Sequence, residues 1–466
     1  MMAKPQEKHS RARFWCLFGL LLVLVSVRYA LQIDIPRVLF LLIIGSIAVF
    51  GDRDEIVAIC MALIPMHESV DLFYSLVICF AVYVFKYHSQ FRFGYNMLLV
   101  VFIAVWELLH CFFTSFSIVF YLTCIIPFII LAILIASDAE KLDYPFMIRA
   151  LAWAVLGTCI MMLVRVFYFA NFNIALALFN LQRMGSDLHS NIEDVEVAGG
   201  QIHPNSIGII AVLASTGLMQ LRQLKASRVS DLVLMCAILV LAALSASRTY
   251  LACLALMIFL LIFSEKGGIQ KKIRLLVMLA SAIAIAVFVF AVLFPDSLAY
   301  YISRFFVSDL TTGREDLMDL YHAFIINNPN VLFFGIGLQE YGDRLVNVYR
   351  VAFNSPHNSI QEIIIAWGLP GLIIFAIQFF NMYVAASRRN KKLALINWIP
   401  LIIILFKGMA GQILTSPYTM LTLSYAYLSL CQDFSAKKEI DDEVYNSAPK
   451  RRNIIKKFCF RKDEKL

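Results

Sequence analysis

A histidine lies where a long polar stretch meets an apolar segment, in Ser355-Pro356-His357-Asn358. Serine is a favoured N-cap and proline a favoured first helical residue, so the sequence predicts a helix that starts here with His357 in its first turn. The positive end of a helix disfavours an imidazolium ion, so we expect a neutral ring that can accept a proton. His203, which precedes Pro204-Asn205 and another apolar run, is a second candidate of the same kind.

Two arginines have surroundings that favour anion binding. Arg248 ends Leu244-Ser-Ala-Ser-Arg248, a short turn between two apolar runs whose small residues let another helix approach closely. Arg314 lies in Thr312-Gly313-Arg314-Glu315, where threonine and glutamate three residues apart form a capping box. Free N–H groups at a helix start bind phosphate together with a guanidinium, so we expect an anion at Arg314. The alternative is a solvated charge in a loop.

The residues after the capping box predict an amphipathic helix. Apolar side chains recur at helical spacing and form one face, and Asn328-Pro329 ends the pattern. We expect this helix to rest on the membrane surface or on the helix bundle. The residues of its apolar face are Leu317, Leu320, Tyr321, Phe324 and Ile325.

Ionisable residues inside apolar segments are costly in a membrane and usually functional. Four of them are expected near helix ends on one side of the membrane: Glu107, Arg165, Arg248 and Lys407. We expect no comparable group inside the apolar runs on the other side. For Arg165 and Lys407 the alternative is that a long side chain simply reaches the membrane interface.

The composition predicts a polytopic membrane protein. Of 466 residues, 61% are hydrophobic and 15% are charged, against about 25% charged in a soluble domain. We expect an all-α bundle of about 12 to 14 spans. Because the segment 55–66 is short and contains Pro65, twelve crossings with a re-entrant pair are an alternative to fourteen. The predicted apolar segments are 14–32, 37–51, 55–66, 70–86, 95–113, 117–136, 147–170, 204–221, 229–246, 248–264, 273–294, 358–386, 394–409 and 411–431.

Charge placement orients this bundle. Both termini and the short loops near 222–228, 266–274 and 388–392 are basic, which is typical of cytoplasmic segments and explains the net charge of +8 without nucleic acid. The two long polar stretches, 171–202 and 295–356, carry more acidic than basic residues, so we expect them outside. The predicted division is a bundle at 1–294 with an external loop at 171–202, a long external loop at 295–357, C-terminal helices at 358–431 and a basic cytoplasmic tail at 432–466.

Other motifs that would indicate a different chemistry are absent from the sequence. Gly335-Ile336-Gly337 lacks the strand, the third glycine and the acidic residue of a dinucleotide site, so it predicts a loop turn. There is no P-loop, HExxH or GxSxG sequence, and His67-Glu68 is too sparse for a metal site. None of the ten cysteines falls in either external loop. We therefore expect no metal, no cofactor and no disulfide framework.

In this order, the residues resemble the O-antigen ligase and polymerase family of bacterial surface-polysaccharide assembly, over roughly residues 180–380. That family has an arginine after a small-residue turn, a Gly-Arg pair opening a long external loop, a Gly-x-Gly, and a His-Asn before the next span with glycines further on. An earlier arginine-glycine and a Pro-Asn helix start are also typical. The matching residues are Arg183 and Gly185, Pro204 and Asn205, Leu244–Arg248, Gly313-Arg314, Gly335–Gly337, His357-Asn358 and Gly368–Gly371.

The resemblance implies metal-independent glycosyl transfer from undecaprenyl-pyrophosphate-linked sugars, on the outer face of the bacterial cytoplasmic membrane. Arg248 and Arg314 would stabilise the pyrophosphate leaving group, and His357 would act as base or positioning group for the acceptor, with inversion at the anomeric carbon. Asp316 and Asp343 are possible sugar ligands or substitute bases. The expected substrate-binding residues are Arg165, Arg183, His203, Asn205, Glu340, Asn358 and Lys407.

Three functions remain open at this point. We favour a polymerase for capsule, exopolysaccharide or O-antigen, because nothing in the sequence suggests a protein acceptor. A ligase would use the same donor and pass the glycan to a lipid or another acceptor. A polysaccharide transporter or flippase would have charges near the membrane midplane and matched halves, neither of which is evident. Expected partners are lipid-linked glycans and membrane lipid, with a chain-length regulator and a flippase as further candidates.

Overall fold

The described part of the chain is helical throughout. The computed structural model describes residues 11–66, 72–88, 95–111, 117–169, 171, 204–243, 247–264, 268–270, 272–274, 276–277, 281, 288, 291–292, 314–339, 341–351, 356, 358–390, 393–409 and 417–434. The main helices are α1 (Ala12–Ala30), α2 (Arg37–Phe50), α3 (Arg53–Met66), α4 (Leu72–Tyr87), α5 (Tyr95–Cys111), α6 (Ile118–Ala136), α7 (Tyr144–Phe169), α10 (Pro204–Gln223), α11 (Val229–Ala243), α12 (Arg248–Ser264), α15 (Arg314–Asn327), α16 (Pro329–Phe334), α18 (Ser359–Arg389), α19 (Leu395–Met409) and α20 (Pro417–Leu430). Three short elements are η2 (Ala139–Lys141), α17 (Tyr341–Asp343) and the π-helix η3 (Arg344–Val348).

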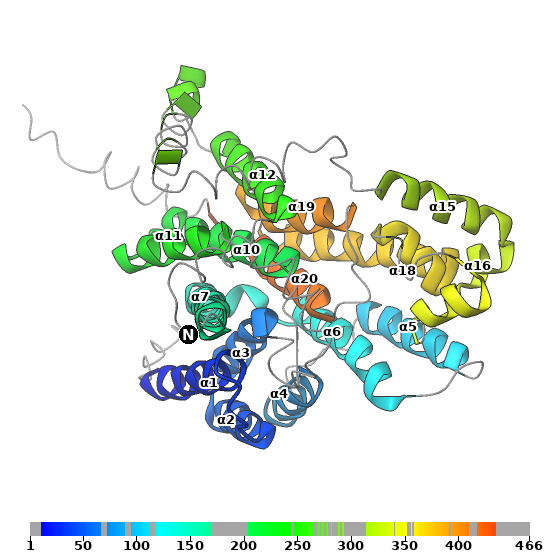
Figure 1. Ribbon diagram of the computed structural model, residues 1–466, viewed down its shortest axis with the longest axis horizontal. Helices are drawn as coiled ribbons and strands as arrows, with labels where there is room; N and C mark the ends of the chain where they lie inside the picture. The colour runs from blue at the N-terminus through cyan, green and yellow to red at the C-terminus, as the bar shows by residue number, and fades with distance from the viewer. Residues whose placement is uncertain are drawn as a thin grey trace, which may run out of the picture.

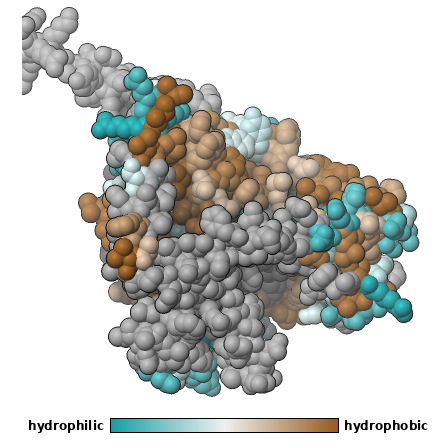
Figure 2. Space-filling model, turned by 45° about the horizontal axis from the view of Figure 1, so that its top comes forward, coloured by the Kyte–Doolittle hydropathy of each residue, from teal (hydrophilic) through white to brown (hydrophobic). Residues whose placement is uncertain are grey.

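The predicted apolar segments correspond closely to these helices. Each predicted segment that falls within the described residues coincides with one helix, and most of 273–294 lies outside them. Four described helices, α1, α6, α7 and α18, are long and apolar enough to cross a membrane, and seven further apolar helices have 10–17 residues. Hydrophobic surface covers much of the coloured face in Figure 2, with hydrophilic patches towards its ends. The expected all-α membrane bundle is confirmed.

Helix α3 lies inside the bundle rather than at its edge. Every residue from Glu55 to Met66 is buried, and α3 packs along α7. The helix spans 14 residues, Arg53–Met66, with Pro65 inside it. A helix surrounded on all sides by other helices needs no amphipathic pattern, which explains why this short segment is apolar around its whole circumference.

One end of the bundle, which we call the charged end, is held by ion pairs. Arg149 of α7 donates to both carboxylate oxygens of Asp231 on α11, at 3.0 and 2.9 Å, and to the carbonyl of Ala226. Arg11 bonds Asp54 at 3.1 Å and Asp143 at 2.8 Å. The expectation that this side has no ionisable group inside the apolar runs is therefore wrong. Residues near the ends of those runs find partners on neighbouring helices, which compensates for their burial.

A buried polar network ties the C-terminal helices to the same region. Gln220 of α10 donates to the Ile396 carbonyl on α19 and to the Ser429 hydroxyl on α20, both at 2.7 Å. Asn397 of α19 donates to the Ser429 carbonyl at 2.9 Å. Each contact crosses between helices, so it fixes their register where apolar packing alone would tolerate sliding.

The opposite end, which we call the loop end, carries the helix termini of interest. Because α7, α11 and α19 start near the charged end, Arg165 and Lys407 lie towards the far ends of their helices, and Arg248 begins α12 there. Helix α18 runs the other way, from Asn358 at the loop end to Arg389, which pairs with Glu140 near the charged end. In Figure 1, α15 and α16 lie at the right beside α18 and α5, while α11 and α1 lie at the left. The expected placement of Arg165, Arg248 and Lys407 near helix ends on one side of the bundle agrees with the structure, although ionisable residues lie at the charged end as well.

Replacing Asp231 by alanine should destabilise the protein by roughly 3 kcal/mol, because it leaves the half-buried Arg149 guanidinium without its carboxylate. Thermal unfolding in detergent measures the effect. The matched control is Asp138→Ala, whose pair with Lys141 is largely exposed and should contribute about 0.5 kcal/mol or less. Equal losses in the two variants would contradict the assigned role of the buried pair.

Candidate functional site

Arg248 and Lys407 are brought to the loop end by two closely packed helices. Helix α12 packs along both α10 and α19. The contact with α10 depends on Gly208, where a Cβ atom would lie 2.7 Å from the Tyr250 Cβ. Lys407 is buried near the end of α19, the helix that packs along α12, and α12 begins at Arg248. The two cations are therefore carried by adjacent helices at the same end of the bundle.

Helix α18 starts three residues later than the sequence predicts. Its N-cap is Asn358, whose side-chain oxygen accepts from the amides of Ile360 at 3.0 Å and Gln361 at 3.2 Å. The prediction of Ser355 as cap and Pro356 as first helical residue is wrong, because the asparagine satisfies two free amides of the first turn. Position 357 therefore precedes the helix instead of lying in its first turn, and His357 itself lies outside the described residues.

Asn358 also connects the start of α18 to the end of α19. Its side-chain nitrogen donates to the Met409 carbonyl at 3.4 Å. Met409 lies two residues after Lys407, so the buried lysine and the start of α18 are near neighbours. This contact places Asn358, which directly follows His357 in the sequence, near the ends of the helices that carry Arg248 and Lys407.

Helix α15 begins at Arg314 and packs against the first turn of α18. The side-chain amide of Gln361 donates to the Met318 carbonyl at 2.7 Å. Met318 lies one turn after Arg314, about 6 Å along the helix axis, and Gln361 is three residues after Asn358. The backbone of Arg314 and the start of α18 therefore meet at the loop end. Only the backbone of Arg314 is among the described features.

The amphipathic pattern of α15 is largely confirmed. Tyr321 and Ile325 are buried, and Leu317 and Phe324 are partly buried against the bundle. Leu320 is 39% exposed, so its assignment to the buried face is wrong. Of the two expected resting places for this helix, the membrane surface and the helix bundle, the structure shows the helix bundle.

The Gly335–Gly337 turn packs its backbone into a break in α18. Gly368 interrupts α18 with φ +68°, and the carbonyls of Ile365 and Ala366 before it accept from the amides of Ile336 at 2.8 Å and Gly337 at 2.7 Å. Gly335 and Gly337 also have positive φ. A Cβ on Gly368 would lie 2.6 Å from the Phe333 carbonyl carbon, and one on Gly335 would overlap the Ala366 carbonyl. A Cβ on Gly337 would meet the His110 side chain, and all three positions have the positive φ that favours glycine.

Glu107 of α5 holds this turn from the other side. Its carboxylate is 1% exposed and accepts from the amides of Leu338 at 2.9 Å and Gln339 at 3.1 Å. The indole N–H of Trp367, next to the break in α18, donates to it at 2.6 Å. A buried carboxylate that accepts three hydrogen bonds joins α5, α18 and the turn into one unit.

The remaining predicted site residues lie near helix ends, on the exposed surface or outside the described residues. Arg165 lies in the last two turns of α7, and the Asn205 backbone lies in the first turn of α10. Asp316 and Asp343 are exposed residues of α15 and α17. Arg183, His203 and Glu340 lie outside the described residues.

A buried carboxylate near the candidate site was missed by the sequence reasoning. Glu362 in the first turn of α18 has 0% exposure, and Tyr341 of α17 packs nearby at 4% exposure. Burial, with the Glu362 carboxylate close by, raises the pKa of the Tyr341 hydroxyl well above its ordinary value, so this group stays protonated. The signal was available, since Glu362 is an acidic residue inside the apolar segment 358–386 and only five residues after His357.

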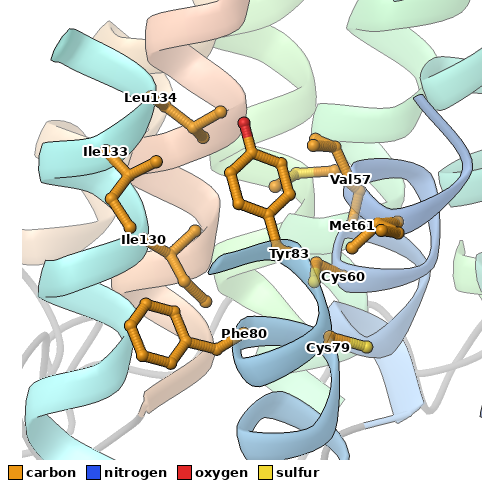
Figure 3. A pocket seen from close by; sticks show the side chains of 10 residues that line it. Val57, Cys60, Met61, Cys79, Phe80, Tyr83, Ile130, Ile133 and Leu134 are labelled. Carbon is orange, nitrogen blue, oxygen red and sulfur yellow. The ribbon is translucent and has the colours of Figure 1, made fainter. Parts of the chain in front are cut away.

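A small cavity elsewhere is not a substrate site. It lies between α3, α4 and α6, holds about 30 Å³, and is lined by apolar side chains with Cys60, Cys79 and Tyr83 (Figure 3). This volume is roughly that of one water molecule. A sugar would not fit, so the cavity is a packing gap at a distance from the loop end.

Residues 232–376 match a family model described as O-antigen ligase. Over this segment the chain is similar to the O-antigen ligase/polymerase-like family. No curated protein matches the chain. Together with its apolar helices, this similarity indicates a multi-pass membrane protein.

The matched segment runs from α11 into α18 and is narrower than the resemblance noted above. It contains Arg248, Arg314 and His357, together with the Gly335–Gly337 turn and the break at Gly368. Arg165, Arg183, His203, Asn205 and Lys407 lie outside it. The turn and break are thus part of the O-antigen ligase segment, whereas Glu107, which holds them, is contributed by an earlier helix.

Substituting Gly368 by alanine should separate the turn from α18, because the new Cβ would overlap the Phe333 backbone and the positive φ disfavours alanine. We expect a loss of roughly 2 kcal/mol or more in stability. Hydrogen–deuterium exchange should rise in residues 329–345. The control is Gly19→Ala in α1, where a Cβ meets nothing within 4 Å and stability should be unchanged or slightly higher. Unaltered exchange in Gly368→Ala would refute the packing role of this glycine.

Proposed function

We propose that this protein is a polysaccharide polymerase that joins undecaprenyl-pyrophosphate-linked repeat units at the outer face of the bacterial cytoplasmic membrane. The reaction transfers the glycan from one lipid carrier to a hydroxyl of an acceptor repeat unit. The new glycosidic bond forms as the bond between the anomeric carbon and the pyrophosphate breaks. The lipid pyrophosphate leaves as an anion, and the acceptor proton passes to a base.

The leaving group explains the choice of residues. A pyrophosphate is stable as an anion, so it needs fixed cations and no general acid. Arg248 and Arg314 would supply these cations, with Arg165, Arg183 and Lys407 as further contacts to the lipid headgroup. Arginine suits this role because its planar guanidinium binds phosphate oxygens in pairs.

His357 would accept the acceptor proton or hold the hydroxyl for attack. Attack from the side opposite the pyrophosphate inverts the anomeric carbon. Asn358, Asn205, His203 and Glu340 would contact the sugars. A glycosidase-like pair of carboxylates is unnecessary, since the donor is already activated.

One pair of contacts supports this assignment most strongly. Gln361 ties the first turn of α18 to α15 one turn after Arg314, and Asn358 ties the same turn to the end of α19 beside Lys407. Segments far apart in the sequence therefore meet at the first turn of α18, which supports the proposal. A transporter is disfavoured, because its charges would be expected near the membrane midplane rather than at one end.

A ligase is the second candidate. It would use the same donor and the same three residues, and would pass the glycan to a lipid or another acceptor. The matched family is described as O-antigen ligase, which favours this candidate, whereas no feature of the chain indicates a protein acceptor. A chain-length regulator and a flippase would act with either enzyme.

Replacing Arg314 by alanine should abolish long polymer while lipid-linked single repeat units accumulate, because the leaving pyrophosphate loses a fixed cation. A fall of about 100-fold or more in turnover is expected from the loss of one such group. The control is Arg222→Ala, an exposed arginine at the charged end. A ligase would instead leave polymer on its carrier and lack the transferred product. Cargo held on the cytoplasmic side would indicate a transporter.

Turnover of purified protein should persist in excess chelator, since arginines rather than a divalent cation are proposed to neutralise the pyrophosphate. The assay compares initial rates with and without EDTA, and with added Mg²⁺. A rate that falls to background in EDTA and returns with Mg²⁺ would rule out the metal-independent mechanism.

A further inference from the structure

We propose that Glu107 is a positioning residue for this reaction, which acts through Arg314 by fixing α15 and α16 against the broken helix α18. This inference rests on the proposed function and adds a residue of α5 that lies outside the matched segment. Glu107 does not touch substrate in this account. Its role is to set the place from which the Arg314 guanidinium reaches the pyrophosphate.

Several hydrogen-bond donors converge on the buried Glu107 carboxylate. Glu107 accepts from two consecutive backbone amides, Leu338 and Gln339, and from the Trp367 indole. Burying a carboxylate in the bundle is costly unless several donors converge on it. Apolar packing alone would allow many similar placements of the turn. The Glu107 carboxylate favours the one placement in which these donors reach it.

Other residues of α5 and of the start of α6 also hold the Gly335–Gly337 turn. The Phe334 carbonyl, at the end of α16, accepts from Trp106 Nε1 at 3.3 Å and contacts His110 Nε2 at 2.9 Å. The Gln339 side chain accepts from the Ser117 amide at the start of α6, at 3.0 Å. Both ends of the turn are therefore fixed to the membrane helices, with Glu107 between them.

The turn is joined to the helix that begins at Arg314 by one short helix. Helix α16 follows α15 directly at Asn328-Pro329, and the turn follows α16. The Gln361–Met318 hydrogen bond then links α15 to the first turn of α18, one turn after Arg314. Loss of the Glu107 contacts would weaken the hold on the turn, so α16 and α15, which lead directly into it, would shift against α18. A displacement of about 1 Å at a catalytic group can lower a rate by about 100-fold.

The test is a double-mutant cycle between Glu107→Gln and Arg314→Lys, with purified full-length protein and a lipid-linked repeat unit as donor. Glutamine keeps the shape of the side chain but turns an amide N–H towards the donors of the turn. Lysine keeps a charge at position 314 and leaves a measurable rate. The matched control is Asp231→Asn, which weakens a similarly buried carboxylate contact at the charged end.

We expect Glu107→Gln to lower kcat by about 10- to 100-fold, with a smaller change in KM for the donor. In the Arg314→Lys background the same substitution should lower kcat by less than about threefold, because Arg314 is no longer there to be misplaced. Asp231→Asn should lower the melting temperature without lowering kcat of the folded protein, and its effects should be the same in both backgrounds.

Three results would overturn the inference, and they can be told apart. If Glu107→Gln lowers kcat by the same factor in both backgrounds, Glu107 does not act through Arg314. If Asp231→Asn lowers kcat as much as Glu107→Gln does, the effect of Glu107 is general destabilisation. If Arg314→Lys alone leaves turnover unchanged, the proposed function fails and this inference fails with it.

Discussion

The architecture of the loop end depends on satisfying the backbone of a helix that is broken inside a membrane bundle. A break exposes carbonyl groups that cannot find water in an apolar environment, and each unsatisfied group costs several kcal/mol. In α18 these carbonyls, at Ile365 and Ala366, are satisfied by amides of the Gly335–Gly337 turn. The turn belongs to the long polar segment between the membrane helices, so this segment becomes part of the bundle instead of a separate lid.

This exchange of hydrogen bonds explains several features at once. Gly335 and Gly368 are needed because side chains there would separate the two backbones. The buried Glu107 is tolerated because the turn and Trp367 supply donors. Helix α15 is then carried to the start of α18, where Gln361 and Asn358 connect it with α19. Arg248 and Lys407 reach the same end on α12 and α19. A site that binds a charged lipid headgroup requires this convergence.

Much of the fold was predictable from the sequence, because long apolar runs determine membrane helices almost regardless of context. Helix α15 and its end at Asn328-Pro329 were also predicted from local signals, namely the capping box and the helical spacing of apolar residues. Features that depend on contacts between distant segments were not predictable. The cap at Asn358 displaced the expected Ser355, since its preference depends on which amides it reaches. The partners of Arg149 and Glu107 lie 82 and 231 residues away, at Asp231 and Leu338, and periodicity does not report such pairs.

The central claim is that one diphosphate is held at the loop end by the guanidinium groups of Arg248 and Arg314. The most direct measurement is an experimental structure of the full-length protein in lipid with a polyprenyl-pyrophosphate oligosaccharide bound. The account predicts both guanidinium groups within about 3 Å of pyrophosphate oxygens, with the His357 imidazole facing the anomeric carbon from the opposite side. A pyrophosphate bound at the charged end, or bound with either arginine remote from it, would contradict the account.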